Sequence, residues 1–354
     1  MNEPSEWTLE ELHLHLQAAI EVELMTLPPY LTALFSLVPG KNAKAAELVH
    51  SVAMEEMLHF ALAANVFNAV GGEPNLAGGG YVPRYPLALP FKRPGETVEV
   101  GLQPFSTQAL EVFMAIEKPN HPDVQPPAAG PDAARPRVLE LAEEYGYETI
   151  GAFYKAIEEG LTSLDARGNI FTGEPSRQIG PEFYEGAGGG HLLVISDLAT
   201  ALEALEEIVE QGEGDVDKPG PGEEFDSEGE LAHYYRFKEL YVGREYKPGD
   251  SPLEPTGPPI AVDYTGVFPI KPNLRAEELS GALQKAAEAF NGNYTKLIDQ
   301  LQEGIDGNPE RVGAAIETMI QLGREAGALV KKPLEDGSGL NAGPPWQFLG
   351  AQPA

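Results

Sequence analysis

The sequence contains no cysteine among its 354 residues. This absence excludes disulfides, thiolate-bound metals, iron–sulfur clusters and cysteine nucleophiles. Any metal that the chain binds must therefore be held by oxygen and nitrogen atoms, which are the donors of carboxylates and imidazoles.

Positive charge is also scarce, because 24 lysines and arginines stand against 55 aspartates and glutamates, for a net charge of −31. Such a chain repels nucleic acid and anionic membranes, so we expect neither as a partner. No apolar run approaches the roughly 20 residues that span a bilayer. The opening segment MNEPSEWTLEELH lacks the basic and apolar regions of a signal peptide. We therefore expect a soluble, cytoplasmic protein.

Helical periodicity dominates what is present, and it predicts an all-α fold. The predicted helices cover approximately residues 8–38, 43–70, 137–146, 149–163, 192–211, 229–243, 275–304 and 309–330. The short link PGKN at 39–42 makes the first two helices antiparallel neighbours. Pro28 and Pro29 lie inside the first helix and are expected to kink or restart it, because each lacks an N–H group.

Residues 71–135 interrupt this pattern with Gly/Pro-rich sequence around one short helix that begins after Ser106. Loops of this length are usually functional, so we interpret the insertion as an irregular cap over a helical bundle. The predicted organisation is a bundle over residues 1–245 with this cap, followed by a linker and a C-terminal helical extension over residues 246–354. The metal ligands that the sequence predicts all lie outside the cap.

The candidate site begins with a spacing that occurs twice. Glu56 and His59 are three residues apart in one predicted helix, and Glu230 and His233 are three apart in another. On a helix this spacing places both side chains on one face. A single copy is more often a solvated helix face than a ligand pair, so the interpretation depends on the second copy and on further acids.

Glu23 supplies such an acid, because it falls within an apolar stripe of the first predicted helix. A carboxylate buried among leucines costs several kcal/mol unless it is paired or bound to a metal. Two Glu-x-x-His pairs with one Glu from each of two other helices form the known design of a dinuclear site in a bundle. For the remaining ligand, helical periodicity favours Glu206, whereas the geometry of the helical hairpin favours Glu210.

The order Glu, Glu-x-x-His, Glu, Glu-x-x-His is similar to that of the ferritin-like superfamily. The segments LQAAIEVELMTLPPYLTALFSL, EEMLHFALAANVFNAVGGEP, TIGAFYKAI, IVEQGEG and AHYYRFKEL more narrowly resemble the ferritin-like domain of iminophenyl-pyruvate dimer synthases over about residues 7–245. The resemblance implies a ferritin-like four-helix bundle and favours Glu210 as the remaining ligand. It also matches Tyr30, seven residues after Glu23, to a tyrosine of the superfamily's site, which makes it a candidate catalytic residue.

These residues together predict a metal-dependent oxidoreductase with two iron ions, or manganese as the alternative. We expect it to use O₂ or peroxide on a small-molecule substrate, and the resemblance suggests an amino-acid-derived imine or 2-oxo acid. Two alternatives stay open: a metal-binding or storage protein without oxidative turnover, and a dimanganese catalase-like enzyme. A homo-oligomer is compatible with each of them.

Overall fold

The structure is a computed structural model that describes residues 6–76, 82–89, 91, 98–119, 137–184, 189–214, 224–226 and 228–350. Much of the predicted cap, residues 77–81, 90, 92–97 and 120–136, lies outside the described residues. Within the described ranges, no helix is long and apolar enough to cross a membrane.

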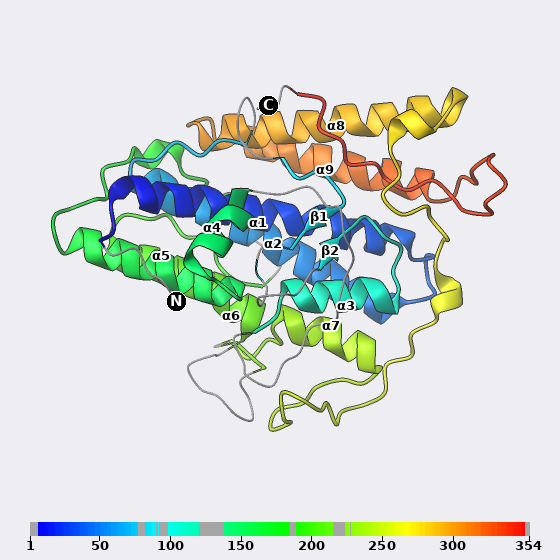
Figure 1. The fold of residues 1–354 in the computed structure, drawn as a ribbon, viewed down its shortest axis with the longest axis horizontal. Helices are drawn as coiled ribbons and strands as arrows, with labels where there is room; N and C mark the ends of the chain where they lie inside the picture. Colours follow the sequence, from blue (N-terminus) through cyan, green and yellow to red (C-terminus); the bar gives the residue numbers. More distant parts are fainter. Residues whose placement is uncertain are drawn as a thin grey trace.

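Two long antiparallel helices, α1 (Leu9–Ser36) and α2 (Ala43–Ala69), form the centre of the molecule (Figure 1). Helix α1 continues through Pro28 and Pro29, so the predicted restart is wrong. Pro29 cannot donate to the carbonyl of Met25, but the Tyr85 hydroxyl donates to that carbonyl at 2.6 Å instead. The insertion therefore supplies the hydrogen bond that the proline removes.

Four shorter helices form a second layer, which we call the short-helix layer. Its members are α3 (Thr107–Ile116), α5 (Ile150–Asp165), α6 (Leu198–Glu213) and α7 (His233–Val242). Helices α3 and α5 both contact α1, whereas α6 and α7 both contact α2; α3 packs on α7, and α5 packs on α6. Helices α3 and α5 thus take the place of one long helix beside α1. Helices α6 and α7 take the place of another beside α2. Helix α4 (Arg137–Tyr145) packs beside them against α1.

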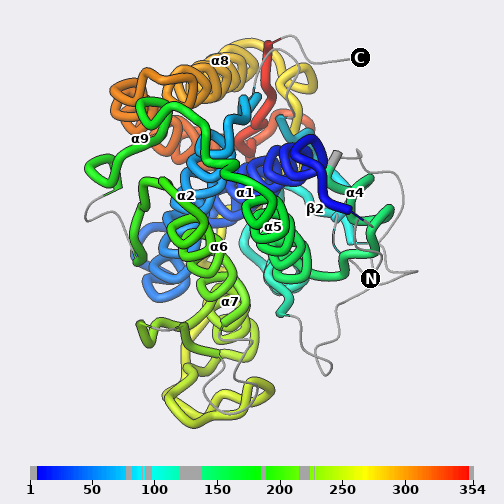
Figure 2. The backbone as a smooth tube through the Cα atoms, turned by 90° about the vertical axis from the view of Figure 1, so that its left-hand side faces the viewer, coloured from blue at the N-terminus to red at the C-terminus, as the bar shows by residue number. Residues whose placement is uncertain are grey.

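The C-terminal hairpin of α8 (Gly281–Ile305) and α9 (Glu310–Leu329) covers the opposite face of α1 and α2 (Figure 2). The Trp346 indole donates to the Thr32 hydroxyl at 2.9 Å and fastens the following segment to α1. One cluster of buried apolar side chains includes residues of α1, α2, α8 and α9. The C-terminal extension therefore shares a core with the bundle. The predicted boundary between bundle and extension at residue 245 stays a prediction.

Two predicted helix starts are wrong, and one predicted irregular segment contains a small sheet. Helix α6 begins at Leu198, where Asp197 and Thr200 form a capping box. Helix α7 begins only at His233, because the carbonyl of Glu230 accepts from the Asp226 N–H at 2.8 Å and holds that residue in a turn. The insertion is not wholly irregular, since β1 (Leu87–Ala88) and β2 (Glu99–Val100) pair as a small antiparallel sheet.

Candidate metal centre

A polar group lies inside the bundle where ends of the short-helix layer meet the middle of α1 and α2. The chain leaves α3 at Glu117 and enters α7 at His233. Helix α6 ends close to the start of α5, where the Gly151 N–H donates to the Glu213 carboxylate at 2.6 Å. Helix ends leave backbone groups without partners inside the helix, so polar side chains are more easily accommodated there than along a helix interior.

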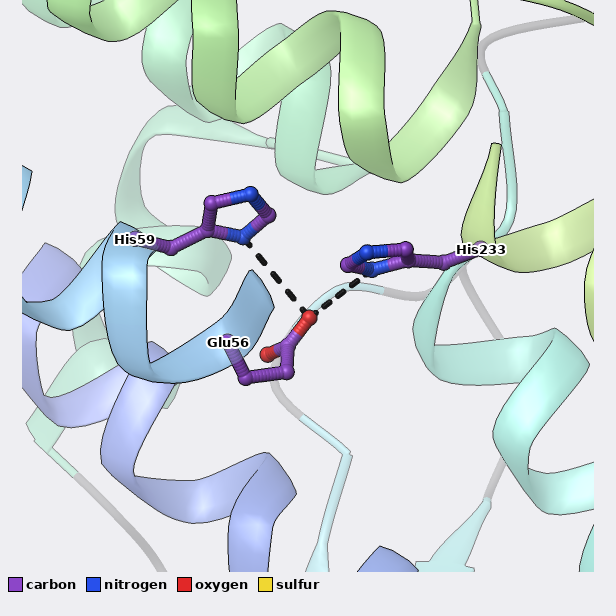
Figure 3. A group of neighbouring side chains, drawn as sticks. All are labelled: Glu56, His59 and His233. Carbon is purple, nitrogen blue, oxygen red and sulfur yellow. Dashed lines mark ion pairs between the residues drawn. The ribbon is translucent and has the colours of Figure 1, made fainter. Parts of the chain in front are cut away.

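Three buried residues form the centre of this group: Glu56 and His59 from α2, and His233 from α7 (Figure 3). Each offers one ligand atom, and these atoms all lie within 4.8 Å of one another. Glu56 Oε1 is 2.9 Å from His233 Nδ1 and 3.7 Å from His59 Nδ1. All three side chains are at most 2% exposed, so water does not screen their charges.

The second nitrogen of each imidazole is held by a neighbour. His233 Nε2 lies 3.0 Å from Glu55 Oε2, which can only accept, so this nitrogen carries the hydrogen. His59 Nε2 lies 2.9 Å from Gln211 Oε1. Because the Gln211 amide nitrogen donates to Glu207, its oxygen faces His59 as an acceptor. In their neutral forms both rings therefore turn the lone pair of Nδ1 towards Glu56, as metal-binding histidines do.

The carboxylates from α1 and α2 are held in the same manner. The Tyr154 hydroxyl donates to Glu23 Oε1, while Glu23 Oε2 lies 3.6 Å from His59 Nδ1. The Thr26 hydroxyl donates to Glu56 Oε2 at 2.5 Å, while Glu56 Oε1 faces the histidines. Each carboxylate thus has one oxygen fixed by a hydroxyl and the other turned towards an imidazole nitrogen.

Glu117 repeats this arrangement from the insertion, and sequence reasoning missed it. The Tyr30 hydroxyl donates to Glu117 Oε1, and Glu117 Oε2 lies 3.6 Å from His233 Nδ1. The signal was present, because Glu117 continues the buried stripe of Leu110 and Phe113 at helical spacing. The sequence predicts that the metal ligands lie outside the cap, and that stays a prediction, but Glu117 brings a carboxylate from the cap beside them.

A buried ion pair supports the α7 side of the group. Arg236 Nη1 lies 2.6 Å from Glu55 Oε1 and donates to the Ser51 hydroxyl at 3.0 Å. Burial disfavours the charged form of Glu55, but the hydrogen bonds and charges of His233 and Arg236 outweigh it and lower its pKa to about 2. Glu55 therefore stays ionised and keeps His233 oriented.

The group holds more negative charge than the imidazoles can balance. Burial, and then the charges of Glu117 and Glu23, raise the pKa of Glu56 to about 7 against the opposing effect of His233. Burial lowers the pKa of His233, but the neighbouring carboxylates outweigh it and hold that pKa well above its usual value. Protons balance the charge in this state, and a bound cation could replace them.

Not every predicted ligand is brought into the group. Glu230 lies before α7, its side chain is 51% exposed, and it pairs with Arg236 at 3.4 Å. Glu210 is partly buried in the last turn of α6 but is not among the three centre residues, and Glu206 is exposed. The ligand roles of Glu210 and Glu230 stay predictions, while α6 reaches His59 through Gln211.

The donor set suits a first-row metal. Carboxylate oxygens and imidazole nitrogens bind iron and manganese, and these donors are already oriented by hydroxyl, amide and carboxylate partners. The clearest sign is His233 Nδ1, a fully buried atom that makes no aligned hydrogen bond within the described residues. A metal at this position would give that atom the partner that buried polar groups need.

Comparison with known protein families matches residues 16–242 to the ferritin-like family. This chain belongs to the ferritin-like family. It is also 26% identical over 331 residues to dichlorochromopyrrolate synthase of Lentzea aerocolonigenes. That alignment covers 84% of this ferritin-like chain but only 29% of the synthase, so the chain spans less than a third of that relative.

A crystal structure of a ferritin-like protein from Caulobacter vibrioides shares the fold. The alignment covers 98% of this chain and 99% of the Caulobacter chain, with a TM-score of 0.60 and 20% sequence identity. The all-α ferritin-like prediction is confirmed, as is the distant relation to a synthase of the predicted kind.

Proposed function

We propose that this ferritin-like protein is a metal-dependent oxidoreductase that holds a pair of iron ions, with manganese as the alternative. One observation carries the proposal. Two buried imidazoles, His59 and His233, direct Nδ1 towards the same oxygen of Glu56 while their Nε2 atoms are held from behind. A cation between these atoms could be bound by all three, in place of the protons that otherwise hold the imidazoles and Glu56 together.

The side chains around the site would bind the metal or hold its ligands in position. Glu23, Glu56, His59 and His233 would bind the metal, and Tyr154 and Thr26 would keep the carboxylates in position. When bound, iron would supply the exchange of electrons with O₂ or peroxide that these side chains cannot carry out alone. Burial of the group excludes water and strengthens the electrostatic interactions within it.

The proposed substrate class is a small amino-acid-derived imine or 2-oxo acid. The relation to dichlorochromopyrrolate synthase supports this class, although only part of that protein corresponds to this chain. A cavity of about 900 Å³ between α8 and α9 is lined by none of the residues of the group.

The test is to load the purified protein anaerobically with Fe²⁺ or Mn²⁺ and to count the ions bound per chain. We expect two ions for the natural protein, and O₂ uptake that depends on an added imine of an aromatic 2-oxo acid. His59→Leu should lose metal and O₂ uptake, whereas the control His50→Leu, at an exposed position of the same helix, should lose neither.

The other outcomes distinguish the alternatives. Metal binding without substrate-dependent O₂ uptake would favour a metal-binding or storage protein. Rapid O₂ release from peroxide by the manganese form would favour a catalase-like enzyme. Equal metal content in His59→Leu and the natural protein would contradict the site itself.

A further inference from the structure

Glu117 is placed at the metal centre by a segment that the Glu-x-x-His pattern does not include. It directly follows α3 and is 4% exposed. Tyr30 donates to its Oε1, so that oxygen has a partner. Its Oε2 lies 3.6 Å from His233 Nδ1, which is too far for a hydrogen bond but suits two donors with an ion between them.

The arrangement around His233 repeats the arrangement around His59. Glu23 Oε2 and Glu56 Oε1 lie 3.6 and 3.7 Å from His59 Nδ1. Glu117 Oε2 and Glu56 Oε1 lie 3.6 and 2.9 Å from His233 Nδ1. Each half therefore has one histidine and one carboxylate of its own, and Glu56 belongs to both.

We propose that Glu117 is the metal ligand that completes the His233 half of the site, in the role that the repeated Glu-x-x-His spacing assigns to Glu230. One ion would lie between Glu23, His59 and Glu56, and the other between Glu117, His233 and Glu56. This inference rests on the proposed function, because it requires that metal fills the group.

The position of Glu230 supports the assignment. Its side chain is half exposed, and it lies 3.4 Å from Arg236 on the outer side of the Glu55 ion pair. Glu55 thus stands next to His233 on the side of Nε2, whereas Glu117 faces Nδ1. Only a carboxylate on the Nδ1 side can share an ion with that nitrogen.

Charge and burial give the second argument. A buried carboxylate costs several kcal/mol unless it is paired or bound to a metal, and Tyr30 donates to one oxygen of Glu117. Three ionised carboxylates with two neutral imidazoles carry a charge of about −3, of which a single divalent ion offsets only part. The unaligned, buried Nδ1 of His233 provides an independent sign of a missing partner at the same point.

The insertion between α2 and α4 then acts as more than a cover. The residue directly after its helix α3 would be a ligand, so the second ion would bind only when α3 is packed on α7. The first ion would depend on Glu23 of α1 and on Glu56 and His59 of α2, and none of these residues lies in the insertion.

The experiment compares Glu117→Gln with Glu230→Gln, by anaerobic titration of Co²⁺ followed by its absorption spectrum and by ion counting after gel filtration. Glutamine keeps the size of the side chain and still accepts the Tyr30 hydrogen bond. We expect two ions in the natural protein and in Glu230→Gln, and one ion in Glu117→Gln. Circular dichroism and the melting temperature show whether each variant is folded.

A second variant, Glu117→Asp, keeps the charge but withdraws it by one methylene group, and we expect it to bind two ions with the second at least tenfold weaker. Two full-strength ions in Glu117→Gln would overturn the inference and leave the proposed function intact. Loss of the second ion in Glu230→Gln but not in Glu117→Gln would also overturn it. A natural protein that binds no ion would instead overturn the proposed function.

Discussion

The long helices α1 and α2 and the short-helix layer contribute to the candidate metal centre in different ways. Helices α1 and α2 place Glu23, Glu56 and His59 from the middle of regular helices. The short-helix layer places Glu117 immediately after one helix and His233 at the first residue of another. A side chain inside a helix is positioned by the register of that helix, whereas one at an end is positioned by where the helix stops.

The difference shows how a bundle can carry a polar centre without weakening its whole length. Helices α1 and α2 stay continuous and bury apolar residues on both sides of the site. The interruption between α3 and α5, and between α6 and α7, brings helix ends to the level of the site, where polar groups already need partners. The α3 and α7 side is therefore the part where sequence changes should most easily alter metal binding.

The largest effect is expected from the residue that both halves share. Glu56→Gln should lose both ions, because it removes the negative charge between His59 and His233. Without metal, the variant should be at least as stable as the natural protein, since it removes a buried charge. Metal counting and urea unfolding of the metal-free protein test this expectation. The control is Glu47→Gln on the exposed face of α2, and retention of one ion by Glu56→Gln would show that the halves are independent.

Most of the fold, and the presence of Glu23, Glu56 and His59 in one buried polar group, could be predicted from the sequence. Glu23, Glu56 and His59 follow from periodicity, because α1 and α2 are long and their burial repeats with the helical period. The all-α fold follows from the same signal. The tertiary structure shows that these three side chains lie together. Nothing in the sequence pattern specifies which groups hold the other carboxylate oxygen of each Glu or Nε2 of His59.

His233 was predicted, but its carboxylate neighbour Glu117 was not, because that contact depends on where helices end. The spacing of Glu230 and His233 suggested a shared helix face. However, Leu231 pairs with Phe225 in an isolated β-bridge, and α7 begins only at His233. Boundaries are the least certain part of a pattern, and here the helix begins at His233, four residues after the predicted start at about residue 229, which leaves Glu230 outside it. Glu117 continues a buried stripe of its short predicted helix, but its contact with His233 follows only from the packing of α3 on α7, which is far away in the chain.

The second largest effect concerns stability on the α7 side. Glu55→Leu should lower the free energy of unfolding by about 3–5 kcal/mol, because Arg236 would remain buried without its partner. The double variant Glu55→Leu with Arg236→Met should recover much of this loss. Urea unfolding of the metal-free proteins tests both, and a single variant as stable as the natural protein would show that this ion pair does not hold α7 in place.

Each half of the site should respond to its own tyrosine. Tyr154→Phe frees Glu23, and Tyr30→Phe frees Glu117, so each should weaken one ion by about 10–100-fold and leave the other unchanged. Competitive titration with a chelator measures the two affinities. The control is Tyr241→Phe, whose hydroxyl donates to Glu111 at the surface. If either tyrosine variant weakened both ions equally, the comparison between two separate halves would fail.

The smallest effect should come from the N-terminal capping residue of α3, the helix that Glu117 directly follows. The Ser106 hydroxyl accepts from the Ala109 N–H at 3.1 Å at the start of α3, and its removal in Ser106→Ala should cost about 1 kcal/mol. Thr149→Ala removes the equivalent bond at the start of α5, where Thr149 accepts from the Ala152 N–H at 3.0 Å. Both variants should lose similar stability in urea unfolding. Only Ser106→Ala should weaken the ion on the His233 side, since α3 is the helix that holds Glu117 against α7. Equal weakening by both variants would mean that general stability, and not the position of α3, controls this half of the site.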